Sequence, residues 1–169
     1  HADGAAPLHA DLRIALERLT PVGGARPGAV LFACSMNAVR SPMAACIARQ
    51  LFPNQIYVRS CGARSGAPDP FVDAVMQEIG CDISRHRPKT FEELDESGFD
   101  LIISLAPEAH HKALEMTRTE AVEVEYWPTP DPTLATGSRD QILDSYRSVR
   151  DLLMARIKKR FAWSPAPSG

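Results

Sequence analysis

The chain has 169 residues, of which 44% are hydrophobic and 24% charged, and this size and composition are typical of a single soluble globular domain. The 19 lysines and arginines are balanced by 21 aspartates and glutamates, so the formal net charge of -2 leaves no basic surplus for nucleic acid or an anionic membrane. The longest apolar runs have about five residues, far fewer than the roughly 20 of a membrane helix, and no stretch has the pattern of a signal peptide. We therefore expect a cytoplasmic protein without a nucleic-acid or membrane partner.

The four cysteines are too few for a small disulfide-stapled domain and lack the spacing of a metal-binding knuckle. They are Cys34, Cys46, Cys61 and Cys81. We therefore expect no metal and no cofactor. Cys46, Cys61 and Cys81 are expected to be small buried hydrophobic residues. Cys34 belongs to the motif that carries the predicted chemistry.

Residues 1–27 are predicted to form an N-terminal helical extension and a linker. Within residues 7–20, one helical face is made of leucines, namely Leu8, Leu12, Leu16 and Leu19. The prolines and glycines of residues 21–28 end this helix, because both residue types interrupt regular structure. The leucine face predicts packing against another surface and leaves three roles open: a cap on the main domain, self-association, or contact with the rim of an active site.

From Ala29 onward, short apolar segments alternate with segments of helical periodicity. The predicted strands are residues 29–33, 55–60, 99–104 and 122–127, and the predicted helices are residues 42–52, 70–79, 91–96, 108–116 and 139–161. This alternation implies β-α-β crossovers and therefore a three-layer α/β fold, in which a four-stranded parallel sheet is flanked by helices. We expect this domain to span residues 28–163, followed by a flexible tail at residues 164–169.

Residues 34–42 follow the first predicted strand and lead into a helix, at the sheet edge where such folds bind ligands. Their sequence, Cys-x5-Arg-Ser-Pro, forms a loop whose backbone N–H groups can surround a tetrahedral oxyanion, and the helix N-terminus adds partial positive charge. Arg40 can contact two oxygens of the anion at once. The same positive field favours the thiolate of Cys34, to which Ser41 can donate a hydrogen bond. The motif therefore predicts a nucleophile aimed at phosphorus.

This loop resembles that of the low-molecular-weight protein tyrosine phosphatases, a family whose fold also serves thioredoxin-coupled arsenate reductases. The resemblance covers roughly residues 28–162. Four further segments carry it, namely Val58-Arg59-Ser60-Cys61-Gly62, Ala67-Pro68-Asp69-Pro70, residues 80–86 and Phe99-Asp100-Leu101-Ile102-Ile103. Asp131-Pro132 lies where the family keeps an acid, on a proline-rich loop before the last helix. The fold is therefore expected to be like that of this family, with the N-terminal helix as an addition.

The resemblance implies a two-step phosphatase reaction through a cysteinyl-phosphate, without a metal. Cys34 would be the nucleophile, Arg40 the phosphate clamp, and Asp131 first the general acid and then the general base. The substrate would be a phosphorylated protein or a small phosphomonoester. We expect inorganic phosphate or sulfate to bind in the same loop.

The resemblance also assigns supporting residues around the loop. Asn37 would hold the loop in a strained shape through hydrogen bonds, with support from Ser60 and His86, and Ser41 would hydrogen-bond the thiolate. The other phosphate-binding positions of the loop are Ser35, Met36, Ala38 and Val39.

Several positions depart from the family's pattern. Met36 stands where a glycine is usual, so it must either tolerate the same dihedral angles or alter the loop. Val39 replaces a second cysteine, so a protective disulfide with the nucleophile is not expected. Residues 60–68 contain no aromatic, and Thr133 and Leu134 stand where aromatics flank the family's pocket. Because those walls stack on a phenol ring, we expect hydrolysis of small aryl phosphates with weak selectivity for phosphotyrosine.

Two other functions remain open. Arsenate reduction needs a pair of resolving cysteines after the third strand, and residues 104–110 contain none. A non-catalytic module that binds phosphate or a phosphorylated partner fits Met36 and the missing aromatic walls, but it needs neither the cysteine nor the aspartate of the predicted site. His110 and His111, which begin a predicted helix, are expected to face the solvent.

Overall fold

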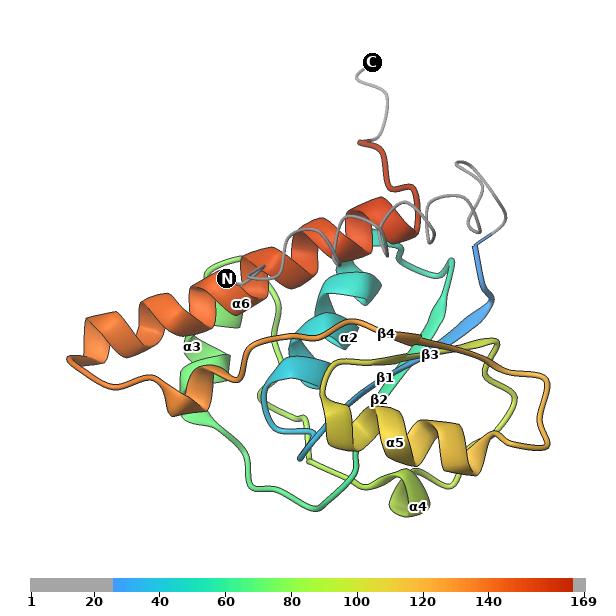
Figure 1. The fold of residues 1–169 in the computed structure, drawn as a ribbon. Coiled ribbons are helices and arrows are strands. Elements are labelled where there is room, and N and C mark those ends of the chain that lie inside the picture. The colour runs from blue at the N-terminus through green and yellow to red at the C-terminus, as the bar shows by residue number, and fades with distance from the viewer. Residues whose placement is uncertain (1–25, 166–169) are drawn as a thin grey trace, which may run out of the picture.

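A four-stranded parallel sheet lies between two layers of helices in the computed structural model, which describes residues 26–165 (Figure 1). The strands are β1 (Ala29–Cys34), β2 (Tyr57–Gly62), β3 (Leu101–Ser104) and β4 (Glu123–Tyr126). They are ordered β2-β1-β3-β4, and every neighbouring pair is parallel. The predicted fold class is confirmed, and the carboxyl ends of the four strands meet at one edge of the sheet.

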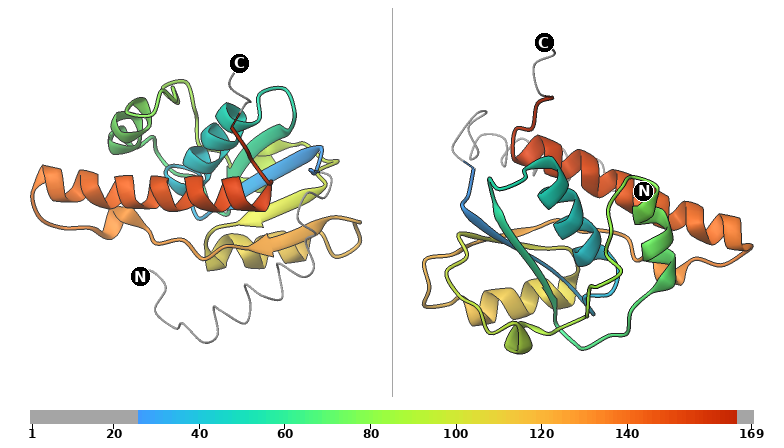
Figure 2. Two further views of the ribbon diagram at one scale, coloured as in Figure 1. Left: turned by 90° about the horizontal axis from the view of Figure 1, so that it is seen from above. Right: turned by 180° about the vertical axis from the view of Figure 1, so that it is seen from behind.

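The helices divide between the two faces of this sheet. They are α2 (Arg40–Leu51), α3 (Pro70–Gln77), α4 (Phe91–Leu94), α5 (Pro107–Met116) and α6 (Arg139–Arg160), with a 3₁₀ helix η1 (Pro132–Leu134). Helices α2, α3 and α6 cover one face, whereas α5 and the short α4 lie on the other (Figures 1 and 2). No helix in the described part of the chain is long and apolar enough to cross a membrane. The predicted helix at residues 7–20 and the end of the predicted tail lie outside the described residues.

The central strand β1 is buried on both faces, which explains its unbroken apolar sequence. Phe32 belongs to the core under α2 and α6, whereas Ala33 belongs to the core under α5. Cys34 continues this alternation and lies on the α2 face. The strand register pairs Ala33 with Cys61, so the Cys61 side chain belongs to the opposite, α5 face of the sheet.

Several elements differ by one or two residues from their predicted bounds, and two of these differences lie beside the predicted anion loop. Helix α2 begins at Arg40 and not at Pro42, so the last residues of the loop form the first turn of the helix. Strand β2 ends at Gly62 and not at Ser60, because Cys61 and Gly62 still pair with Ala33 and Cys34 of β1. The guanidinium of Arg40 is therefore mounted on a regular helix.

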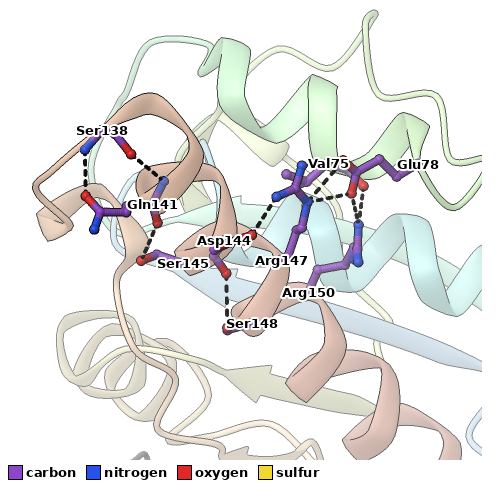
Figure 3. Close-up of polar contacts among 9 residues, drawn as sticks. All are labelled: Val75, Glu78, Ser138, Gln141, Asp144, Ser145, Arg147, Ser148 and Arg150. Atoms are coloured by element: carbon purple, nitrogen blue, oxygen red, sulfur yellow. Dashed lines mark hydrogen bonds and ion pairs between the residues drawn. The ribbon is translucent and has the colours of Figure 1, made fainter.

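An arginine network holds α6 against α3 (Figure 3). Glu78, directly after α3, accepts hydrogen bonds from Arg147 Nη2 at 2.8 Å and from Arg150 Nη1 at 2.7 Å. These two guanidinium groups lower the pKa of Glu78 from 4.5 to about 2. A capping box between Ser138 and Gln141 fixes the first turn of α6. The loop that precedes α6 is therefore anchored at its carboxyl end.

Arg26, the first described residue, contacts the end of α6 and Phe52. Its Nε donates to Phe161 O at 2.9 Å, and its guanidinium lies 4.6 Å from the centroid of the Phe52 ring. The chain therefore enters the domain beside the end of α6.

Candidate active site

The thiol of Cys34 lies at the carboxyl end of β1, on the floor of the predicted loop. Its Sγ is 3.0 Å from Ser41 Oγ, and the Ser41 N–H donates to the same sulfur at 3.4 Å. Cys34 is only 2% exposed, so water does not surround the sulfur. The Ser41 hydroxyl also has Cys61 O within 3.3 Å as an acceptor, and it donates to the sulfur when Cys34 is a thiolate, which can only accept.

Asn37 fixes the shape of the loop from inside. Its backbone is left-handed, with φ at 54°, a conformation that is unfavourable by about 1–3 kcal/mol unless the surroundings stabilise it. Its Nδ2 donates to Ser41 Oγ at 2.8 Å and to Ser60 Oγ at 2.9 Å, and its Oδ1 accepts from the Lys89 N–H at 3.0 Å. The side chain is fully buried, and these bonds satisfy it.

His86 contacts the same asparagine through the backbone. Its Nε2 lies 2.7 Å from Asn37 O, and because a carbonyl oxygen only accepts, Nε2 carries the proton. Burial lowers the pKa of His86, although the hydrogen bond to the carbonyl opposes this shift. The neutral ring with its proton on Nε2 is therefore the form that fits. Ser60 and His86 both lie against Asn37, where the predicted support requires them.

Met36 fits into the loop without a left-handed backbone. Among the described non-glycine residues, a positive φ occurs at Asn37, Asn54, Asp95 and Ala162. Space comes from two glycines outside the loop: a Cβ at Gly62 would lie 2.7 Å from Asn37 N, and a Cβ at Gly66 would lie 2.7 Å from Met36 O. These glycines let the segment after β2 pack directly on the loop backbone. The Met36 side chain is 40% exposed beside this contact.

The backbone of residues 35–39 leaves its N–H groups open to a ligand. In the described part of the chain, no turn, loop or side-chain hydrogen bond uses one of them as a donor. The side chains of Ala38 and Val39 pack into the core, so these residues offer the site only their backbone. A run of free N–H groups around a thiolate suits a bound oxyanion.

Arg40 adds a positive charge to these N–H groups. It is 8% exposed, with Nη1 donating to Thr129 O at 3.0 Å and Nη2 donating to Ser35 Oγ at 3.3 Å. Both contacts hold the guanidinium beside the loop. Its remaining N–H groups can bind two oxygens of a tetrahedral anion.

Asp131 faces Arg40 from the proline-rich loop before α6. Its Oδ1 accepts from the Thr133 N–H at 3.0 Å and from Thr133 Oγ1 at 2.7 Å, which makes Asp131 the N-cap of η1. Its Oδ2 is left free of these bonds and lies 4.0 Å from Arg40 Nη2. The capping bonds therefore direct one carboxylate oxygen toward the predicted anion site.

The other cysteines match the prediction only in part. Cys61 and Cys81 are buried, but Cys46 on α2 is half-buried and in contact with Cys81, so the predicted burial of Cys46 is wrong. The hydrogen bond with Cys81, together with burial, raises the pKa of Cys46. Burial raises the pKa of Cys61. The described residues contain no group of three or more side chains suited to a metal ion.

The predicted solvent exposure of His110 is also wrong. Its Nδ1 lies 2.8 Å from the buried Ser104 Oγ, and its ring stacks on Tyr126 with centroids 4.7 Å apart. His110 is in the first turn of α5, on the side of the helix that faces Ser104 of β3 and Tyr126 of β4. Burial lowers the pKa of this histidine.

Three contributors to the site escaped sequence reasoning. Thr129 O holds Arg40, the Lys89 N–H holds Asn37, and Gly66 makes room for Met36. Two of these are backbone groups, which any residue type could supply. Only Gly66 leaves a signal in the sequence, as a glycine in the segment that follows β2.

The fold and the site define a parallel α/β protein with a buried thiol at the start of the loop that follows its first strand. The sequence model of the low molecular weight phosphotyrosine protein phosphatases matches residues 29–162. The chain belongs to this family.

Relatives within this fold include both reductases and phosphatases. The chain is 32% identical to the glutaredoxin arsenate reductase of Synechocystis sp., over 79% of this chain and 95% of the relative. It is 30% identical to the solved structure of an arsenate reductase in the phosphate binding state, with a TM-score of 0.63 over 79% of this chain and 96% of that one. A low molecular weight protein tyrosine phosphatase from T. tengcongensis is 25% identical, with a TM-score of 0.65 over 78% of this chain and 95% of that one.

Proposed function

We propose that this protein is a phosphatase of the low-molecular-weight type, which hydrolyses phosphomonoesters through a cysteinyl-phosphate. The observation that carries the proposal is the site around Cys34. The N–H and hydroxyl of Ser41 lie against its sulfur, open N–H groups follow it in the loop, and a carboxyl oxygen of Asp131 lies 4.0 Å from the buried guanidinium of Arg40. A protein that only bound phosphate would need neither the thiol nor the carboxylate.

In the first step the Cys34 thiolate attacks phosphorus, a P–S bond forms, and the bond from phosphorus to the ester oxygen breaks. The leaving oxygen takes a proton from Asp131, which thereby becomes a carboxylate. Arg40 and the N–H groups of residues 35–39 stabilise the charge on the phosphoryl oxygens. The alcohol or phenol then departs.

In the second step a water molecule attacks the cysteinyl-phosphate. Asp131 accepts a proton from this water, so the carboxyl group returns to its starting state. The P–S bond breaks, and the Cys34 sulfur leaves as a thiolate that the hydroxyl of Ser41 stabilises. The products are inorganic phosphate and the free enzyme. A catalytic free thiol fits the reducing cytoplasm.

Arsenate reduction is the second candidate, and the names of the relatives favour it. It requires another thiol to attack the Cys34 sulfur. Cys61 is fully buried, lies on the opposite face of the sheet and has a raised pKa. Cys46 and the buried Cys81 are hydrogen-bonded to each other, which raises the pKa of Cys46 and lowers that of Cys81. Cys61 and Cys46 are therefore not suited to resolve Cys34, and a reductase of this sequence would use Cys81 or an external thiol for that step.

The test compares both reactions in one preparation. Phosphate release from phenyl phosphate and arsenate-dependent oxidation of reduced glutaredoxin or thioredoxin are measured for the wild type, Cys34→Ser and Cys46→Ser. We expect phosphate release by the wild type and by Cys46→Ser, none by Cys34→Ser, and no arsenate-dependent oxidation. Arsenate reduction without phosphate release would overturn the proposal in favour of the reductase. Phosphate binding without either activity would favour the non-catalytic module.

A further inference from the structure

We propose that the Arg64–Glu108 ion pair beside the anion loop is a second anion subsite, and that the preferred substrates are phosphomonoesters that carry a carboxylate close to the phosphate. This inference rests on the proposed function and names its substrate class. Arg64 would bind the carboxylate in place of Glu108, while the Cys34 loop binds the phosphate.

The backbone ties Arg64 to the loop. Its N–H donates to Ser35 O at 2.8 Å, and the hydroxyl of Ser35 accepts a hydrogen bond from Arg40 Nη2. A single loop residue therefore separates Arg64 from the guanidinium that would clamp the phosphate. Both cations lie at the sheet edge where the strands end, so one substrate molecule can reach the two.

Glu108 comes to the same place from the other side of β1. It stands in the first turn of α5, which follows β3 after a short connection. Arg64 Nε donates to its Oε1 at 3.0 Å and to its Oε2 at 2.8 Å. The ion pair thus joins the segment after β2 to the segment after β3, next to the first residue of the anion loop.

A ligand can replace Glu108 as the partner of Arg64 at a small cost in free energy. The side chains of Arg64 and Glu108 are 61% and 43% exposed, and an ion pair this exposed contributes little net stability. A carboxylate on a bound substrate presents the same two oxygens as Glu108 to the guanidinium. Its phosphate holds it beside Arg64, so it competes with the tethered Glu108 as an intramolecular group. In the proposed complex the substrate carboxylate takes the place of Glu108 on Arg64.

The residue type at position 64 fits this role. The segment of residues 61–67 has no aromatic to stack on a phenol ring, and Arg64 is its only charged residue. Helix α5 has Ala106 as its N-cap, without a side-chain hydrogen bond, so its first N–H groups also favour an anion near Glu108. In this proposal the charge of Arg64, and not stacking on an aromatic side chain, determines which substrate is preferred.

The experiment measures binding of four phosphonates, which cannot be hydrolysed: benzylphosphonate and its three analogues with a ring carboxylate at the 2-, 3- or 4-position. Titration calorimetry is done on the wild type, Arg64→Gln and Glu108→Gln. Arg118→Gln is the matched control, because Arg118 is exposed beyond the far end of α5. The same variants are then compared in kcat/KM for phenyl phosphate and the carboxyphenyl phosphates.

We expect Arg64→Gln to weaken binding of the best carboxylated phosphonate by about tenfold and to leave benzylphosphonate nearly unchanged, as for the loss of one charge-assisted contact. Glu108→Gln should strengthen binding of the carboxylated phosphonate several-fold, because the Glu108 carboxylate no longer competes for Arg64. If the ratio of the dissociation constants for benzylphosphonate and the best carboxylated phosphonate is the same in Arg64→Gln and Arg118→Gln, this inference is wrong. That result would leave the proposed phosphatase activity unaffected. Loss of phosphonate binding and of aryl phosphate hydrolysis in the wild type itself would overturn both.

Discussion

The floor and the rim of the candidate site are built in opposite ways. On the floor, Asn37 is fully buried and all its side-chain hydrogen bonds are satisfied. On the rim, Leu134 is 77% exposed, and Arg64 is held only by an exposed ion pair and one backbone contact. The floor has little freedom to change, whereas the rim can vary without disturbing the fold. We infer that the floor carries the chemistry and that the rim selects the substrate.

The energetics support this division. Removing one partner from a buried hydrogen-bond network leaves another group unsatisfied, which costs about 1–3 kcal/mol. Substitutions at exposed positions usually change stability by less than about 0.5 kcal/mol. Variants of the floor should therefore affect turnover or folding strongly, and variants of the rim should affect substrate preference alone.

After the complete loss of activity expected for Cys34→Ser, the largest effect is expected for Asp131→Asn. The asparagine can still cap η1, so the change removes proton transfer and little else. We predict that kcat for phenyl phosphate falls by about 10²–10⁴-fold. The loss should be smaller for 4-nitrophenyl phosphate, whose leaving group needs less protonation. Steady-state kinetics with both substrates measure this.

Asp69→Asn is the matched control for that prediction. Asp69 also precedes a proline and caps a helix, since its Oδ1 accepts from the Phe71 N–H at 2.8 Å. The control should keep most of its activity. Equal losses in the two variants, or equal losses with both leaving groups, would argue against Asp131 as the general acid.

The next effect concerns the stability of the floor. Asn37→Ala removes three side-chain hydrogen bonds from a buried site, and we predict that the free energy of unfolding falls by about 2–4 kcal/mol. Asn54→Ala is the control, because Asn54 is exposed and also has a left-handed backbone, with φ at 61°. The free energy of unfolding of this control should fall by only about 1 kcal/mol, because alanine is less favourable than asparagine in a left-handed backbone conformation. Urea denaturation measures both, and similar losses would show that the hydrogen bonds contribute nothing.

A smaller effect is expected on the rim. Leu134→Tyr restores an aromatic next to the proposed acid, and we predict that kcat/KM for phosphotyrosine rises by about 2–10-fold, as expected for one aromatic contact. The free energy of unfolding should stay within about 0.5 kcal/mol of the wild type. Leu114→Tyr, at an exposed leucine on α5, should leave kcat/KM unchanged. An equal rise in kcat/KM for phosphotyrosine in both variants would show that the effect does not come from the active site.

The smallest effect concerns pH. Burial lowers the pKa of His86 in the folded protein below its ordinary value of 6.5, so the unfolded chain binds more protons between the two values. The free energy of unfolding should therefore fall as the pH drops below 6.5, toward the lower pKa of the folded state. His86→Gln should reduce this slope, and His111→Gln, at an exposed position, should keep it. Denaturation at several pH values would contradict the prediction if His86→Gln kept the full slope.

Sequence patterns predicted the fold and the core of the site because both depend on side-chain types at fixed spacings. The apolar runs of β1 and β3 and the Cys-x5-Arg spacing predicted a parallel sheet with Cys34 and Arg40 in one loop. Asp131 is about 90 residues further along the chain, and it could be assigned only through resemblance to a family. Its Oδ2 lies 4.0 Å from Arg40 Nη2, a proximity that depends on the whole fold.

The features that could not be predicted depend on backbone groups and long-range contacts. Thr129 O and the Lys89 N–H carry no residue-specific signal, although both hold site residues. The predicted exposure is confirmed for His111 and wrong for His110. Tyr126 and Ser104, which the fold brings beside α5, cover the ring of His110, and the sequence of the helix does not reveal these long-range contacts.

The most direct test of a covalent phosphatase mechanism is to trap the intermediate. Wild-type protein is mixed with excess phenyl phosphate, quenched in acid within one turnover, digested, and mapped by mass spectrometry, with Asp131→Asn and Cys34→Ser treated alike. We predict a phosphoryl group on the peptide that contains Cys34, in the wild type and in Asp131→Asn, and none in Cys34→Ser. Phosphate release without any phosphorylated Cys34, or release that persists in Cys34→Ser, would contradict the mechanism.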